Sequence, residues 1–116
     1  MVHVAFVLGK PPKASTIFPE VFDRLAAAGV DSWLHLPHDD DVQQEALRAA
    51  DLVVHRGLND GALGLIRELH LAGSVLLNPY PGVVQLADRV AMLRALDGLP
   101  VPPTRVVATW REVAAA

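Results

Sequence analysis

The chain contains no cysteine and few aromatic residues. Among its 116 residues are no Cys, two Trp, one Tyr and three Phe. The lack of cysteine excludes a disulfide framework, a thiolate metal site and a cysteine nucleophile. Aromatic residues make up 5% of the chain although 52% of it is hydrophobic. The core must therefore be built from Val, Leu, Ile and Ala, a composition that is typical of a packed α/β domain.

The sequence also lacks an excess of positive charge and a long apolar run. Ten scattered basic residues and thirteen acidic ones give a net charge of -3, so no positive stripe is available to follow a nucleic-acid backbone. The apolar N-terminal run, Val2–Leu8, is too short for a signal-peptide core, and no other run reaches membrane-spanning length. We expect neither nucleic acid nor a membrane as partner, and a cytoplasmic location.

Short β-branched runs alternate with longer amphipathic segments along the chain. This alternation predicts βαβ units and an α/β fold, with a doubly wound, mostly parallel sheet and helices on both faces. Strands are expected at residues 2–8, 32–36, 52–55, 74–77 and 105–108. Helices are expected at 19–28, from 39–41 to about 50, at 61–72, near 88–96 and from 110 to 116.

Two lysines lie in a stiff loop directly after the first expected strand. The loop reads Gly9-Lys10-Pro11-Pro12-Lys13, and open α/β sheets usually keep their ligands at such carboxyl ends of strands. Lys10 and Lys13 could grip an anion there, or belong to an ordinary solvated loop. The loop lacks the second glycine and the Gly-Lys-Ser/Thr ending of a Walker A motif, and it is not a dinucleotide fingerprint.

The third expected strand ends in an imidazole and a guanidinium, His55 and Arg56. Strand alternation places these two side chains on opposite faces of the sheet, so only one of them can face a given cleft. Arg56 could bind a carboxylate or a phosphate in a two-pronged manner. A histidine at a strand end is more often a hydrogen-bonded neighbour of the core than a functional group.

Two imidazoles and three carboxylates gather between His35 and Asp41, which are the ingredients of a metal site. Ligands at this spacing converge only on a regular helix, and Pro37 makes the segment an extended turn. We therefore interpret 39–41 as the negatively charged start of a helix and expect no metal site. His3 and His70 stand alone and are most simply structural.

Three segments in the second half together resemble the end of a pre-ATP-grasp domain, the Rossmann-like N-terminal lobe of ATP-grasp enzymes. Residues 75–79 read as a strand ending in Asn78-Pro79, and Asp88-Arg89 opens a helix. Residues 98–104 then read Gly-Leu-Pro-Val-Pro-Pro-Thr, like the exit toward the nucleotide-binding domains. The resemblance lies in the order and spacing of all three. It implies a substrate-side domain at 1–104 and the start of the central ATP-grasp lobe at 105–116.

The first half resembles two branches of that family. Residues 51–57, a strand ending in an arginine and a glycine, resemble the peptide-modifying glutamate ligases. Residues 6–13 resemble the first loop of inositol polyphosphate kinases, whose lysines meet substrate phosphates. The ligase branch implies a carboxylate that is activated as an acylphosphate and passed to an amine, whereas the kinase branch implies phosphorylation of an alcohol.

The resemblance also implies a division of labour within a longer enzyme. Downstream ATP-grasp domains of the same protein would clamp ATP and Mg²⁺, and this lobe would bind an anionic small-molecule or peptide acceptor through Lys10, Lys13, Arg56 and Asn78. Arg89 would reach the nucleotide, although many ligases carry lysine there, and arginine changes the hydrogen-bond geometry. No catalytic residue and no bound cofactor are expected in this chain alone, which is then inactive.

An alternative hypothesis is that the chain is a non-catalytic α/β binding module and not part of an enzyme. A receiver-like module needs an acidic residue at the end of the third strand, where this chain has His55 and Arg56. That version of the binding module is therefore disfavoured. An edge strand of the sheet could pair two copies of the chain, and the sequence leaves homo-oligomerisation open.

Overall fold

The structure, a computed structural model, describes residues 1–39, 41 and 43–115. Asp40, Val42 and Ala116 lie outside the described residues. The structure therefore describes only part of the expected helix start at 39–41 and of the last expected helix. The chain forms two compact units, Met1–Tyr80 and Pro81–Ala116. The further boundary expected between residues 104 and 105 stays a prediction.

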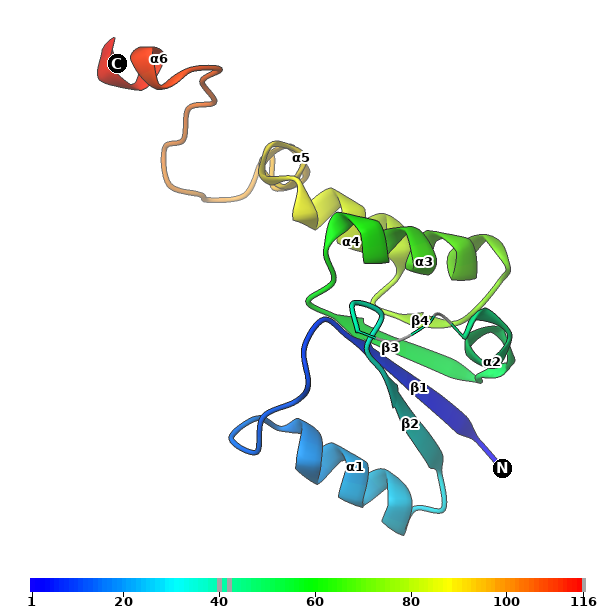
Figure 1. The fold of residues 1–116 in the computed structure, drawn as a ribbon. Coiled ribbons are helices and arrows are strands. Elements are labelled where there is room, and N and C mark those ends of the chain that lie inside the picture. Colours follow the sequence, from blue (N-terminus) through cyan, green and yellow to red (C-terminus); the bar gives the residue numbers. More distant parts are fainter. Residues whose placement is uncertain (40, 42, 116) are drawn as a thin grey trace. The chain divides into compact units, whose positions relative to one another are not determined.

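The first unit contains a four-stranded parallel sheet (Figure 1). Its strands are β1 (His3–Leu8), β2 (Asp31–His35), β3 (Leu52–Arg56) and β4 (Leu76–Leu77), arranged in the order β2-β1-β3-β4. The chain leaves β1 toward β2 on one side and then adds β3 and β4 on the other. The point at which this direction reverses, between β1 and β3, is the place where open α/β sheets bind ligands.

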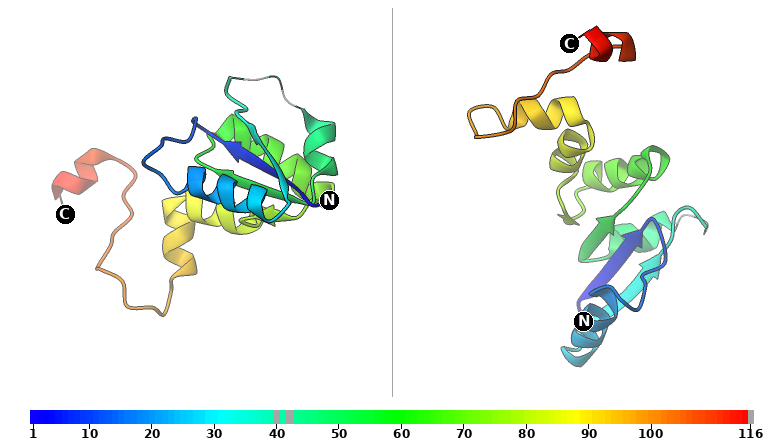
Figure 2. Two further views of the ribbon diagram at one scale, coloured as in Figure 1. Left: turned by 90° about the horizontal axis from the view of Figure 1, so that it is seen from below. Right: turned by 90° about the vertical axis from the view of Figure 1, so that its left-hand side faces the viewer.

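Helices cover both faces of this sheet, which confirms the doubly wound α/β fold (Figures 1 and 2). Helix α1 (Phe18–Ala27) lies on one face, and α2 (Gln44–Ala49) and α3 (Asp60–Leu71) lie on the other. Side chains of β1 alternate between two core clusters because successive residues of a strand point to opposite faces. One cluster is Val4, Phe6 and Leu8 with residues of α1; the other joins Ala5, Val7, Leu47, Val53, Leu65, Ile66 and Leu69.

The predicted start of α2 is wrong. The helix begins at Gln44, and Asp39 belongs to a turn in which its N–H donates to the Leu36 carbonyl at 3.0 Å. Aspartate side chains favour turns and caps over helix interiors, because they compete for nearby backbone hydrogen bonds. The carboxylates of Asp39 and Asp41 therefore precede the helix instead of opening it.

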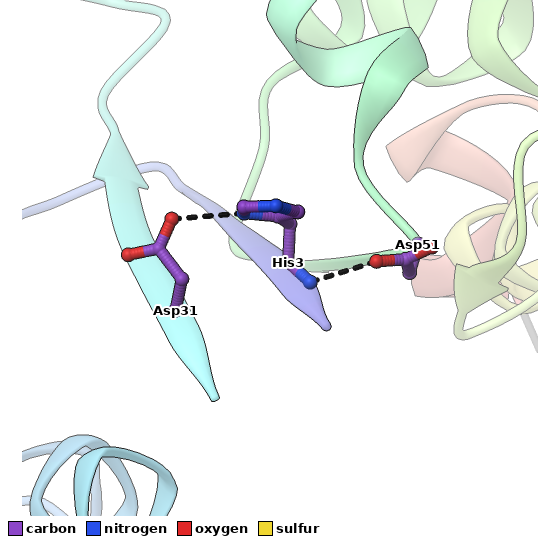
Figure 3. A network of polar contacts seen from close by, with 3 residues as sticks. All are labelled: His3, Asp31 and Asp51. Carbon is purple, nitrogen blue, oxygen red and sulfur yellow. Dashed lines mark hydrogen bonds and ion pairs between the residues drawn. The ribbon is translucent and has the colours of Figure 1, made fainter. Parts of the chain in front are cut away.

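Polar contacts join three strands at the amino-terminal edge of the sheet (Figure 3). The His3 N–H donates to Asp51 Oδ2 at 2.7 Å, and the Asp51 N–H donates back to the His3 carbonyl at 2.9 Å. His3 Nδ1 lies 2.9 Å from Asp31 Oδ2 at the start of β2. These contacts are solvent-exposed and lie at the edge opposite the carboxyl ends, so their role is to hold the strand starts together.

The remaining helices are α4 (Tyr80–Ala87), α5 (Arg89–Ala95) and α6 (Trp110–Ala115). Asp88 caps α5, because its Oδ1 accepts from Val90 N at 2.8 Å. Helix α4 was not among the expected helices. Its Pro81 lies in the first turn, where a missing N–H leaves no helical hydrogen bond unmade.

The expected strand at 105–108 is wrong, whereas the helix expected from residue 110 is confirmed as α6. A β-branched run forms a strand only when a neighbouring strand pairs with it. Residues 81–115 contain no strand that could do so. Within the described part of the chain, no helix combines the length and apolar character that crossing a membrane requires.

Candidate functional site

A pocket of about 470 Å³ opens at the carboxyl ends of β1 and β3, on the face of the sheet that α1 covers. Its lining comes from both strand ends and from the loop between β1 and α1: Leu8, Gly9, Lys10, Pro11, Pro12, Lys13, Thr16, Phe18, Arg56 and Gly57. Arg56 pairs with Leu8 in the sheet register, so both side chains point to the same face. Three of the four predicted substrate-binding residues, Lys10, Lys13 and Arg56, are thereby brought together.

The two strand ends touch through Gly9. Its N–H donates to the Arg56 carbonyl at 3.0 Å, and a Cβ added at Gly9 would lie 1.9 Å from the Gly57 carbonyl oxygen. Gly57 turns the chain away with a φ of +69°, a conformation that glycine adopts without strain. The lysine loop and Arg56 can be this close only because no side chain stands between them.

The lysine loop is held by its own hydrogen bonds. The Thr16 N–H and the Thr16 hydroxyl both donate to the Lys13 carbonyl, at 3.0 Å and 2.6 Å. Pro11 and Pro12 restrict the backbone of the same loop. The backbone of the loop around the two lysines is therefore restrained before any ligand binds.

No described residue neutralises the three cations of the pocket. Among the described residues, no carboxylate lies within ion-pair distance of Lys10, Lys13 or Arg56, and no acidic side chain lines this pocket. An anion that enters would accept charge-assisted hydrogen bonds from a guanidinium and from ammonium groups. The arrangement can bind and orient an anionic group.

A larger hollow of about 900 Å³ lies between α2 and α3, but its chemistry differs. Glu45 and Glu68 are the charged residues in its lining, so it does not suit an anion. The described residues contain no group of three or more His, Cys, Asp or Glu side chains that could hold a metal ion. The smaller, cationic pocket at the switch point is therefore the candidate site.

Asn78 does not line the pocket with the other three predicted residues. Its backbone carbonyl oxygen lies 2.7 Å from His55 Nε2. Since a carbonyl only accepts, Nε2 carries the proton and donates. His55 is 6% exposed and faces away from Arg56, as the strand alternation predicted. Its hydrogen bond to the residue that follows β4 gives it a structural role. A substrate contact of the Asn78 side chain stays a prediction.

Arg89 is the first residue of α5, directly after the capping Asp88, and its side chain is exposed. It belongs to the second compact unit, whereas the pocket belongs to the first. Its expected contact with a nucleotide stays a prediction.

Two pocket residues were missed by the sequence reasoning, Thr16 and Phe18. Thr16 follows Lys13 by three residues, a spacing at which a hydroxyl can close a turn on a preceding carbonyl. That signal was available in the sequence. Phe18 carried no such signal, because only the packing of α1 against β1 brings its ring to the pocket.

Comparison with known proteins gives no further assignment. No protein-family model matches the chain, and a search of curated proteins finds no match.

Proposed function

We propose that this chain is the N-terminal, acceptor-binding domain of an ATP-grasp enzyme, a carboxylate–amine ligase that works through an acylphosphate. The observation that carries the proposal is the pocket at the switch point, where Lys10, Lys13 and Arg56 line one cavity and none of the described lining residues is acidic. The order of the motifs at residues 75–79, 88–89 and 98–104 supports the ATP-grasp assignment. The cationic pocket supports an anionic ligand.

In this proposal the chain's own residues bind and orient the acceptor of the phosphoryl group, which is the carboxylate substrate of the ligase. ATP and Mg²⁺, held by downstream domains, would supply the phosphoryl group and neutralise its charge during transfer. Arg56 would hold an anionic group of the acceptor, Lys10 and Lys13 would stabilise it from the loop, and Arg89 would contact the nucleotide. Fixing the acceptor on a preorganised loop reduces the entropy that the reaction must otherwise lose.

A second candidate is an enzyme of the inositol polyphosphate kinase branch. The observation that favours it is the same convergence of three cations, which would suit a ligand with several phosphates. Both candidates bind an anionic acceptor. They differ in the group that is phosphorylated, which is a carboxylate in the ligase and an alcohol in the kinase.

The proposal is tested in the protein translated from the coding sequence beyond Ala116. We expect two further ATP-grasp lobes and ATP-dependent amide formation; a stop codon directly after Ala116 would contradict the ATP-grasp assignment. In that longer enzyme, Lys10→Glu combined with Lys13→Glu should raise the KM for the acceptor about tenfold or more, because two attractive charges become repulsive. An unchanged KM would remove the loop from the acceptor site.

A further inference from the structure

The pocket between β1 and β3 has an apolar wall beside its cations. Leu8, Pro11, Pro12 and Phe18 form this wall. We infer that the ligand is an organic acid with a carboxylate on an aliphatic or aryl body and without an ammonium group. The inference rests on the proposed acceptor-binding role of this pocket and narrows its substrate class.

The carboxylate end is assigned to Arg56. Its guanidinium extends from the end of β3 and can give two parallel N–H···O bonds to one carboxylate. Lys10 and Lys13 lie on the neighbouring loop and add positive potential without that directional fork. A planar carboxylate therefore matches the donor geometry of this side of the pocket.

The apolar end is assigned to Phe18, Pro11 and Pro12. The Phe18 ring packs edge-to-face on Phe6 with a centroid distance of 6.3 Å and stacks on Phe22 at 6.2 Å. Phe18 is only half-buried and lines the pocket, so part of its surface is left for a ligand. A hydrocarbon body that covers this surface gains the free energy of apolar burial.

A highly phosphorylated sugar fits these walls poorly. Phosphates and hydroxyls have no apolar surface to place on Phe18 and the prolines, and polar groups pressed against such a wall lose water without a replacement hydrogen bond. The apolar wall therefore favours the organic acid over the polyphosphate, and with it the ligase branch over the kinase branch.

An ammonium group on the ligand is disfavoured by charge. Among the described residues, no acidic side chain lines the pocket and no carboxylate is within ion-pair distance of its cations. A ligand ammonium would lie beside three positive charges, and no described residue of the pocket lining offers it an anionic partner. Free amino acids should bind more weakly than the same acids without the amino group.

The test uses the intact 116-residue chain, labelled with ¹⁵N, and a matched set of ligands. These ligands are 3-phenylpropionate, phenylalanine, acetate, inorganic phosphate and inositol hexakisphosphate. Amide shifts of residues 9–16 and 56–57 report binding at the pocket, with Pro11 and Pro12 silent. We expect 3-phenylpropionate to bind tightest, with phenylalanine and acetate each weaker by about tenfold or more, from the unpaired ammonium and the lost apolar contact respectively.

Two arginine variants provide a matched comparison. Arg56→Gln should weaken binding of 3-phenylpropionate about tenfold, since it removes a charge-assisted donor pair. Arg67→Gln makes the same change in charge on the exposed side of α3, outside this pocket, and should leave the affinity unchanged. Circular dichroism of both variants confirms that each is folded.

The outcomes separate the inference from the proposed function. Phenylalanine that binds as tightly as 3-phenylpropionate overturns the exclusion of an ammonium group. Inositol hexakisphosphate or phosphate that binds more tightly, at the same amides and weakened by Arg56→Gln, overturns the organic acid but leaves the pocket as an acceptor site. If none of the five ligands shifts these amides, both the inference and the acceptor role of the pocket are rejected.

Discussion

At the scale of single residues, the close approach of the two strand ends depends on Gly9. A Cβ at this position would lie 1.9 Å from the backbone oxygen of Gly57, and backbone cannot move away as a flexible side chain can. We expect Gly9→Ala to lower the free energy of unfolding by about 1–3 kcal/mol through overpacking. Urea denaturation followed by circular dichroism measures the change.

Gly64→Ala is the control for that substitution. Gly64 lies within α3, and a Cβ there meets nothing within 4 Å. Alanine should therefore stabilise the protein by about 1 kcal/mol, the difference in helix propensity. If Gly9→Ala is also neutral or stabilising, the contact between the two loops is not as close as the structure has it.

A second residue-scale prediction concerns the buried hydrogen bond of His55. Leucine at this position keeps the apolar packing but leaves the Asn78 carbonyl without the donor that lies 2.7 Å away. We expect His55→Leu to cost about 1–3 kcal/mol of unfolding free energy, again measured by urea denaturation. Asp31→Ala, which removes an exposed partner of His3, should cost only about 0–1 kcal/mol. Equal effects of the two substitutions would contradict a structural role for His55.

At the scale of elements, α3 depends on a side-chain cap. Asn59 Oδ1 accepts from the Ala62 N–H at 2.8 Å at the start of the helix that supplies Leu65, Ile66 and Leu69 to the core. Asn59→Ala should lower the free energy of unfolding by about 1 kcal/mol, whereas Asn59→Asp, which keeps the accepting oxygen, should be close to neutral. Thermal denaturation of the three proteins checks this, and an aspartate as damaging as the alanine would argue against capping.

The elements also show where sequence patterns are sufficient. Strands β1 and β3 and helices α1 and α3 were predicted to within one or two residues, because each combines a strong hydrophobic period with clear ends. Helix α4 was missed because prolines can either break a helix or open one. The strand expected at 105–108 was wrong because propensity alone cannot supply a pairing partner.

At the scale of the whole molecule, the two core clusters lie within residues 1–80. All four strands belong to this part, and Tyr80 is the last residue that packs against the larger cluster. We expect a fragment of residues 1–80 to fold and to unfold cooperatively in urea. A fragment of residues 1–73, which lacks β4 and Tyr80, should unfold at a clearly lower urea concentration. A disordered 1–80 fragment would show that the first unit needs the rest of the chain.

The sequence by itself determined the class of fold and the positions of two charged segments, the lysine loop after β1 and the end of β3. Hydrophobic periodicity and strand-ending glycines and prolines are local properties, so the placement of Lys10 and Arg56 at strand ends could be predicted without a structure. Only the tertiary structure decided which of these residues meet. The strand order brings β1 beside β3, so Arg56 joins the lysine loop, Phe18 becomes a wall, and Asn78 is placed elsewhere. Such contacts depend on pairing between distant segments, which no local pattern records.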